Sequence, residues 1–344
     1  MSALRVPIRT IVAIVLAVGL VGLFLRNADV SRVWHAMRGA RLDLLAAGVV
    51  LTLVSYIVRA ERWQYLLEPL GPTRFSMAFR ATVIGFAAST VLPARAGEIL
   101  RPYLLARREG LSATATFATI IVERILDLVS VLSLLAVYLL LFDPGMAARD
   151  STLFTAVRLG GLVVAPVALA ALAVMYALAG HPEWLAAALR TADRRLPPRL
   201  AATLGRVARL FANGFGVLRQ PTRLAASLAW SLVLWLVICG ETWAVARAFN
   251  LDMPFVGSWL MMGLLVVGVS LPTPGGVGGF HEAFRLGATA FFGADNDTAV
   301  GAAILLHATS FVPVTFLGLW YAAREGLDLR SVERLATTPS EVKA

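Results

Sequence analysis

Residues 270–285 read SLPTPGGVGGFHEAFR, and they place two prolines, four glycines and three ionisable side chains within a strongly apolar part of the chain. Proline removes a backbone hydrogen-bond donor and glycine loosens the backbone, so a continuous transmembrane helix is disfavoured here. Apolar residues resume on both sides of the break. We therefore predict that residues 264–292 form a re-entrant helical hairpin, which enters and leaves the membrane on the same side.

The composition of the whole chain is that of an integral membrane protein. Of its 344 residues 58% are hydrophobic and only 15% are charged, and the mean hydropathy is +0.76. A soluble domain of this length does not have such a composition. Helices of about 20 apolar residues cross the hydrocarbon core. We expect an all-α protein with one transmembrane domain, residues 1–325, and six full transmembrane helices at residues 8–25, 42–58, 115–142, 153–179, 224–248 and 298–322.

A second broken segment, residues 79–105, has the same design. Leu92-Pro93 matches Leu271-Pro272, and a glycine follows each proline by four residues, at Gly97 and Gly276. Both segments continue with an acidic residue and an arginine three positions later, as Glu98 with Arg101 and as Glu282 with Arg285. Each predicted hairpin lies between two transmembrane helices. The chain is therefore predicted to contain two related halves, residues 42–142 and 224–322.

The distribution of arginine predicts the orientation of the two halves. The net charge is +10, and the densest arginine cluster lies in residues 180–223, which the positive-inside rule places in the cytoplasm. We expect both termini in the cytoplasm, including the tail of residues 326–344. The first hairpin then opens to the cytoplasm and the second opens to the outside, so the two halves form an inverted repeat.

Two amphipathic segments are expected beside the transmembrane helices. Within the arginine-rich linker, apolar residues recur at helical spacing from residue 200 to 218, which is typical of a helix lying on the inner leaflet. Four arginines between residues 26 and 41 fall in a loop that we place outside, against the positive-inside rule. We predict a short interfacial helix around residues 30–37.

Three motifs carry a resemblance to a known family. LPARAGEILRPYLL at residues 92–105, ERILD at 123–127 and LPTPGGVGGFHEAF at 271–284 together resemble the lysylphosphatidylglycerol synthase transmembrane family. The resemblance covers about residues 8–325, and it implies a bilayer-embedded domain that moves or accommodates a lipid, in the best-studied members an aminoacylated phosphatidylglycerol. Those members carry a soluble aminoacyl-transferase domain after the membrane part. This chain ends about 20 residues past its last predicted helix, so we expect the membrane domain only.

The hairpins define the candidate substrate site. Non-helical backbone at membrane depth needs a polar environment, so two facing hairpin tips predict a polar cavity near the midplane of the bilayer. Helix amino-terminal ends and arginine side chains both suit a phosphate group. We expect substrate binding by Arg95, Gly97, Glu98, Arg101, Pro274, Gly275, Gly276, Gly278, Glu282 and Arg285. Glu98 and Glu282 would face a cationic headgroup or carry a proton; alternatively, each neutralises the arginine three residues later.

A second group of charges begins the third predicted transmembrane helix. Glu123 and Asp127 lie four residues apart on one helix face, with Arg124 beside them. Two such carboxylates can bind a metal or relay a proton, but Arg59 and Arg62 on the neighbouring helix are natural partners. We favour an ion network and expect no metal. Glu241 lies deeper in the membrane, and Arg247 is too far along the same helix to pair with it.

These features favour transport over catalysis. The chain has no phosphate-cradling Gly-Lys-Ser/Thr loop, hydrolase Gly-x-Ser-x-Gly motif or histidine-rich metal spacing, so we expect no enzymatic activity and no cofactor. The favoured hypothesis is a lipid flippase or lipid-linked-substrate transporter of the bacterial cytoplasmic membrane. The alternative is a non-catalytic membrane scaffold for a partner enzyme. Expected partners are a membrane phospholipid and a separate lipid-modifying enzyme; nucleic acid is not expected.

Overall fold

The computed structural model describes residues 8–92, 96–141, 151–180, 215, 220–271 and 273–326. Over this part of the chain the protein is helical and contains no β-strand, so the predicted all-α class is confirmed. The helices are α1 (Ile8–Leu25), α2 (Val30–Gly39), α3 (Leu42–Leu67), α4 (Phe75–Val91), α5 (Gly97–Glu109), α6 (Ala113–Leu141), α7 (Ser151–Gly180), α10 (Pro221–Ala248), α11 (Gly257–Ser270), α12 (Gly279–Phe292) and α13 (Asn296–Arg324). Two short 3-10 turns, η1 (Glu68–Leu70) and η5 (Pro274–Gly276), interrupt them.

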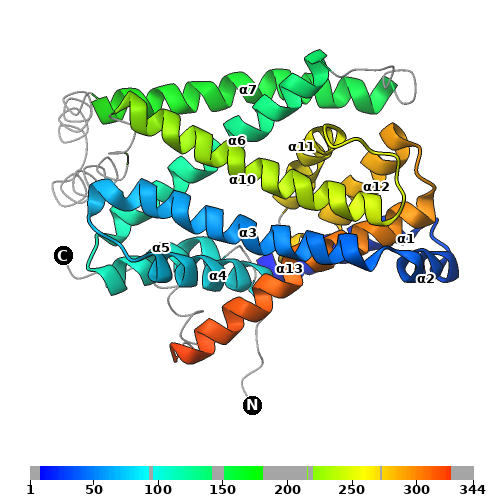
Figure 1. The fold of residues 1–344 in the computed structure, drawn as a ribbon, viewed down its shortest axis with the longest axis horizontal. Coiled ribbons are helices and arrows are strands. Elements are labelled where there is room, and N and C mark those ends of the chain that lie inside the picture. Colours follow the sequence, from blue (N-terminus) through cyan, green and yellow to red (C-terminus); the bar gives the residue numbers. More distant parts are fainter. Residues whose placement is uncertain are drawn as a thin grey trace.

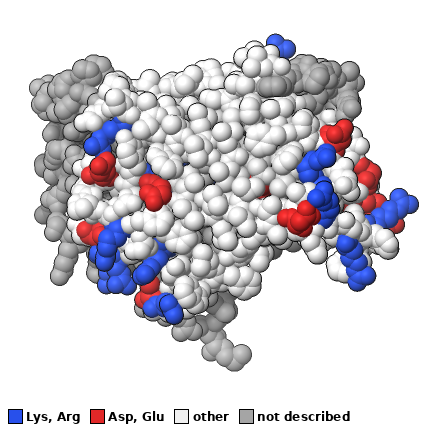
Figure 2. Space-filling model, viewed as in Figure 1, with Lys and Arg blue, Asp and Glu red and all other residues white. Residues whose placement is uncertain are grey.

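Five helical segments within the described residues are long and apolar enough to cross a membrane: Leu42–Leu70, Ala113–Leu141, Thr152–Val174, Pro221–Ala248 and Asn296–Arg324. They coincide with five of the six predicted transmembrane helices. The sixth, residues 8–25, is helical as α1, but the side chains of residues 8–14 lie outside the description, and its full span stays a prediction. Figure 2 shows a broad uncharged belt between two ends where charged side chains gather, as a membrane protein requires.

The second predicted transmembrane helix extends further than expected. Its apolar run stops at residue 58, yet α3 continues to Leu67 and includes Arg59 and Arg62, which are both buried. Their charges have partners on other helices, so the helix does not have to end where the apolar residues do. The predicted surface helix at residues 200–218, most of the linker 180–223 and the tail of residues 326–344 lie outside the described residues.

The helices pack in two related groups around a central pair. α3 and α10 lie side by side at the centre (Figure 1). α4 packs against α5 and α13, whereas α11 packs against α12 and α6. α5 contacts α6, and α12 contacts α13. The two groups correspond in order: α3, α4, α5 and α6 make the same contacts as α10, α11, α12 and α13. The α4–α13 contact, for example, corresponds to the α11–α6 contact.

Each helix pair of the broken segments is joined at a glycine crossing. A Cβ atom on Gly97 would overlap the carbonyl oxygen of Gly85, and a Cβ atom on Gly268 would overlap that of Gly279. Gly97 therefore occupies the place of Gly279, not that of Gly276 as the sequence comparison proposed. The register shifts because the turn η5 adds residues between the break and the start of α12.

The short helix predicted around residues 30–37 is present as α2. The Asp29 side chain caps it by accepting hydrogen bonds from the backbone N–H groups of Ser31 and Arg32, at 2.8 and 3.2 Å. Trp34 is exposed, and the Arg38 guanidinium lies 4.8 Å from its ring centroid. α2 packs against α13. An exposed tryptophan beside arginine suits a membrane interface, where we still predict α2 to lie.

The glycine crossings lead to a test of the fold. We expect Gly97→Ala and Gly268→Ala each to destabilise the protein by about 1–3 kcal/mol, because the new methyl group meets backbone that cannot move aside. The measurement is thermal unfolding of the purified protein in detergent. Gly160→Ala in α7 is the control, since its Cβ would meet no atom within 4 Å. Equal midpoints for all three variants would show that the crossings are looser than described.

Candidate functional site: a charged cavity between the helix pairs

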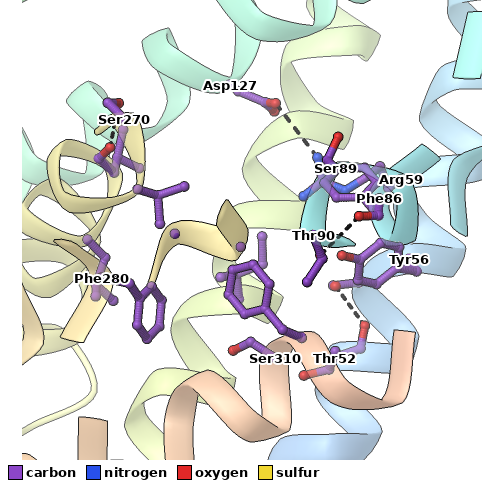
Figure 3. A pocket seen from close by; sticks show the side chains of 18 of the residues that line it. Thr52, Tyr56, Arg59, Phe86, Ser89, Thr90, Asp127, Ser270, Phe280 and Ser310 are labelled. Atoms are coloured by element: carbon purple, nitrogen blue, oxygen red, sulfur yellow. Dashed lines mark hydrogen bonds and ion pairs between the residues drawn. The ribbon is translucent and has the colours of Figure 1, made fainter. Parts of the chain in front are cut away.

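A cavity of about 450 Å³ lies where the two helix pairs approach each other, bounded by α3, α4, α5, α6, α10, α11 and α13. One wall is polar and comes from α3 and the first pair; it includes Tyr56, Arg59, Ser89 and Thr90 (Figure 3). The opposite wall is largely apolar and comes from α11, through Met262, Leu265, Val266 and Val269. The cavity therefore offers a polar and an apolar surface to one ligand.

The second broken segment closes one side of the cavity and touches the first. A Cβ atom added to Gly275 of η5 would come within 3.3 Å of the Thr90 side chain at the end of α4. Gly275 has a φ of +59° and its carbonyl oxygen lies 2.9 Å from Nε2 of His307 on α13. His307 also stacks on Phe311, with ring centroids 4.3 Å apart. His307 thus fixes the position of this turn against α13.

Glu123 of α6 is the centre of a buried ion network. It is fully buried, and its Oε1 accepts hydrogen bonds from Arg101 of α5 at 2.9 Å and from Arg124 at 3.2 Å. The guanidinium groups of Arg62 and Arg59 on α3 lie 3.5 and 3.8 Å from the same oxygen. The Arg101 guanidinium also lies 3.9 Å from the Trp63 ring centroid. One carboxylate thereby joins α5 to α3 and α6.

Asp127, one helical turn later, extends the network to α10. Its Oδ1 accepts hydrogen bonds from Arg62 Nη1 at 2.5 Å and from the Trp235 indole N–H at 3.1 Å. Arg62 also donates to the Ser231 hydroxyl of α10 at 2.8 Å. Arg59 lies 3.8 Å from Oδ2 of Asp127. These bonds tie the central pair α3 and α10 to α6.

The network holds more cationic than anionic groups. Four arginines, Arg59, Arg62, Arg101 and Arg124, surround the two carboxylates of Glu123 and Asp127. Six of their nitrogens are buried without a hydrogen-bond partner: the Nε atoms of Arg59, Arg62, Arg101 and Arg124, and the Nη2 atoms of Arg62 and Arg101. Arg59, Arg101 and Arg124 line the cavity. Guanidinium groups at a cavity wall are suited to an anionic ligand.

The structure brings part of the predicted substrate set together. Gly97, Glu98, Arg101, Gly275 and Gly276 line the cavity. Arg101 donates a hydrogen bond to Glu123 on α6, outside its own helix pair. Glu98 lies half-buried at the start of α5. Pro274 is the first residue of η5, directly before the two cavity glycines. Arg95 lies outside the described residues.

The remaining predicted residues lie elsewhere. Glu282 and Arg285 form a two-bond ion pair on α12, at 2.8 and 2.5 Å, and Arg285 also donates to Asn296 at 3.0 Å. Arg285 borders a separate pocket of about 210 Å³. Gly278 packs against Leu20 of α1. This pair thus neutralises itself, which was the alternative left open for it.

The backbone of the second turn is also occupied. The N–H groups of Gly276 and Val277 donate to the carbonyl oxygens of Thr273 and Pro274, both at 3.1 Å. The N–H of Gly278 donates to Nδ1 of His281 at 3.4 Å. We had expected these groups to face a phosphate. Arg59, Arg101 and Arg124 line the cavity with their side chains.

Sequence reasoning missed several polar groups of the cavity. Ser89, Thr90 and Thr273 line it, and the buried Thr273 hydroxyl has no hydrogen-bond partner. Trp235 was missed although its indole N–H, placed within a transmembrane helix, needs an acceptor and finds one in Asp127. Among the described residues no cluster of His, Cys, Asp or Glu could hold a metal ion.

Fold and site together define a multi-pass α-helical membrane protein with a charged cavity enclosed by two helix pairs. The chain belongs to the family of lysylphosphatidylglycerol synthase transmembrane regions, whose family model matches residues 10–318. The match is to a membrane region.

Two curated relatives match shorter parts of the chain. Glycosyltransferase AglD of Haloferax volcanii is 33% identical over 135 residues, which are 39% of this chain and 20% of AglD. The UPF0104 membrane protein MJ1595 of Methanocaldococcus jannaschii is 31% identical over 87 residues, which are 24% of this chain and 26% of that protein. The chain thus matches only about a fifth to a quarter of the length of these relatives.

The ion network predicts a large effect of one substitution. We expect Glu123→Gln to lower stability by about 3–5 kcal/mol, because it leaves four arginines with a single carboxylate in a buried site. Glu68→Gln is the matched control. Glu68 pairs with Arg223 at the surface, so this substitution should lower the stability of the protein by at most about 1 kcal/mol. Thermal unfolding in detergent measures both. Similar midpoints would mean that the network contributes little.

Proposed function

We propose that this protein is a lipid flippase or lipid-linked-substrate transporter that binds an anionic or aminoacylated phospholipid headgroup in the cavity. The observation that carries the proposal is the placement of three arginines, Arg59, Arg101 and Arg124, on one wall of a membrane-embedded cavity. Guanidinium groups bind phosphate through parallel hydrogen bonds. The apolar wall formed by α11 suits the adjoining acyl chain.

We propose further that the two broken segments are re-entrant hairpins and that the two halves of the chain are inverted. The contact pattern that survives the exchange of α3–α6 for α10–α13 supports this proposal. α4, α5, α11 and α12 have 17, 13, 14 and 14 residues, short of the roughly 20 needed to cross the bilayer. Inverted halves that meet at a central site permit alternating access, in which the cavity opens to each side in turn.

Family membership supports a role with lipids, since the family is named for the membrane region of a lipid synthase. AglD is named a glycosyltransferase, and it matches part of this chain. A non-catalytic scaffold for a partner enzyme therefore remains the alternative function. The cavity favours transport, because a scaffold has no need for arginines that line a membrane-embedded space. We assign no enzymatic activity to this chain.

We place the protein in the bacterial cytoplasmic membrane with both termini in the cytoplasm. A membrane phospholipid is then its ligand, and a separate lipid-modifying enzyme is the partner that would supply or use that lipid. The arginines of the linker 180–223 support this orientation through the positive-inside rule.

Lipid movement in liposomes tests the function. Wild-type protein should move fluorescent phosphatidylglycerol between the leaflets of phosphatidylethanolamine–phosphatidylglycerol liposomes, measured by dithionite quenching. Arg124→Gln should lower the rate about tenfold, because it removes a charge-assisted hydrogen bond to the headgroup. Arg124 is chosen because 40% of its side chain is exposed, more than that of Arg59, Arg62 or Arg101.

Arg107→Gln is the matched control, since Arg107 is an exposed residue of α5 that does not line the cavity. It should keep the wild-type rate. Wild-type rates equal to those of protein-free liposomes would overturn the transport function and support the scaffold.

Labelling from one side of the membrane tests the inverted arrangement. We expect Asp252→Cys, in the loop before α11, to react with an impermeant maleimide in intact spheroplasts. Ser112→Cys, in the loop before α6, should react only after permeabilisation. The native Cys239 is buried and serves as the unlabelled background. Reaction of both positions from the same side would contradict the inverted repeat.

A further inference from the structure

Glu241 of α10 lies in the cavity wall and takes no part in the arginine network. Its side chain is 3% exposed. Its Oε1 accepts hydrogen bonds from the Ser310 hydroxyl at 2.6 Å and from the Thr309 hydroxyl at 3.4 Å, both on α13. The Thr52 hydroxyl of α3 faces the same carboxyl group and is buried without a hydrogen-bond partner of its own.

This carboxyl group sits at a different level of the cavity from the arginines. Thr52 and Arg59 both line the cavity and lie seven residues apart on α3, which is about 10 Å along the helix. Figure 3 shows Thr52 and Ser310 near each other, at the end of the view opposite Asp127. The cavity thus has a cationic level around Arg59 and a hydroxyl-lined level around Glu241.

The surroundings of Glu241 differ from those of the other buried carboxylates. Glu123 and Asp127 each have several guanidinium groups within 4.0 Å. Among the residues that the structure describes, no arginine or histidine forms an ion pair with Glu241. An ionised carboxylate without a cation is strongly disfavoured in a buried site. A bound proton removes that charge.

We propose that Glu241 is a proton-binding site linked to occupation of the cationic level by an anionic headgroup, an inference that rests on the proposed function. Three observations support this proposal: hydroxyl groups surround the Glu241 carboxyl group, no described residue forms an ion pair with it, and it lines the same cavity as the arginines. The titratable or charged groups on the helices that pack against this part of α10 are few: Tyr56 and Arg59 on α3, Arg124 and Asp127 on α6, and His307 on α13, whose Nε2 is engaged by the Gly275 carbonyl. α11 contributes none.

The direction of the linkage follows from charge. An anion bound beside Arg59 repels an ionised Glu241 and favours its protonated form. By reciprocity, ionisation of Glu241 weakens binding of the anion. Two unit charges about 10 Å apart at an effective dielectric constant of about 20 change affinity about tenfold. Anion affinity should therefore fall about tenfold as rising pH ionises Glu241, and binding of the anion should be accompanied by uptake of up to about half a proton.

Calorimetric titration tests the linkage. The purified full chain in detergent is titrated with dioctanoyl-phosphatidylglycerol in two buffers of different ionisation enthalpy, over a range of pH. The wild type should take up at most about half a proton per lipid bound, with the maximum near the pH at which Glu241 titrates, and lose affinity as pH rises. Glu241→Gln should bind with no proton uptake and no such loss of affinity. Glu61→Gln, an exposed carboxylate on α3, is the matched control and should behave as the wild type.

A second measurement needs no lipid. Infrared difference spectra of the empty protein between acidic and alkaline pH should contain the carbonyl band of a buried protonated carboxyl group, and Glu241→Gln should lack it. Absence of this band in the wild type, or its persistence in Glu241→Gln, would overturn the proton site. Lipid binding without proton uptake would overturn the linkage and leave the proposed function standing. Absence of phosphatidylglycerol binding would overturn the proposed function and the linkage together, whereas the infrared band still decides the proton site.

Discussion

The structure depends on a buried network in which four arginines share two carboxylates. An unpaired charge inside the membrane is so unfavourable that the helices carrying these groups have to remain packed together. Glu123 and Asp127 of α6 thereby fix α3, α5 and α10 relative to one another. Because the network holds four arginines and two carboxylates, it also places three arginines, Arg59, Arg101 and Arg124, on one wall of the cavity.

The two helix pairs share a shape and differ in chemistry. Both are joined at a glycine crossing, and both have an acidic residue and an arginine near the start of the second helix. In the first pair Arg101 reaches across to Glu123 and lines the cavity, whereas in the second Arg285 folds back on Glu282. The second pair instead contributes apolar side chains and a turn held by His307. This difference matches what the proposed binding of a headgroup and an acyl chain requires.

Much of this arrangement follows from local pattern. Helical spacing places Glu123 and Asp127 on one face, and charge leaves Arg59 and Arg62 as their natural partners. The proline and glycine breaks likewise indicate where helices end. The sequence pattern does not show which residue on another helix a side chain will bond to. Arg101 is three residues from Glu98 in sequence, yet it bonds to Glu123 on α6. The sequence also does not predict the extra turn η5. Its effect on the alignment of the two helix pairs depends on how the chain packs against α1 and α4.

The geometry also constrains how the cavity can open. Each glycine crossing locks its two helices at backbone contact, so each pair moves most easily as a unit. The first pair is bonded to α6 through Arg101, and the second pair meets the first where Gly275 lies against Thr90. Separation at that contact breaks no hydrogen bond or ion pair between the two residues. Motion of the second pair with α13, which holds its turn through His307 and carries Ser310 beside Glu241, would alter the proton site while leaving the arginine network intact. A substrate anion and a proton could then respond to one movement without any buried charge losing its partner.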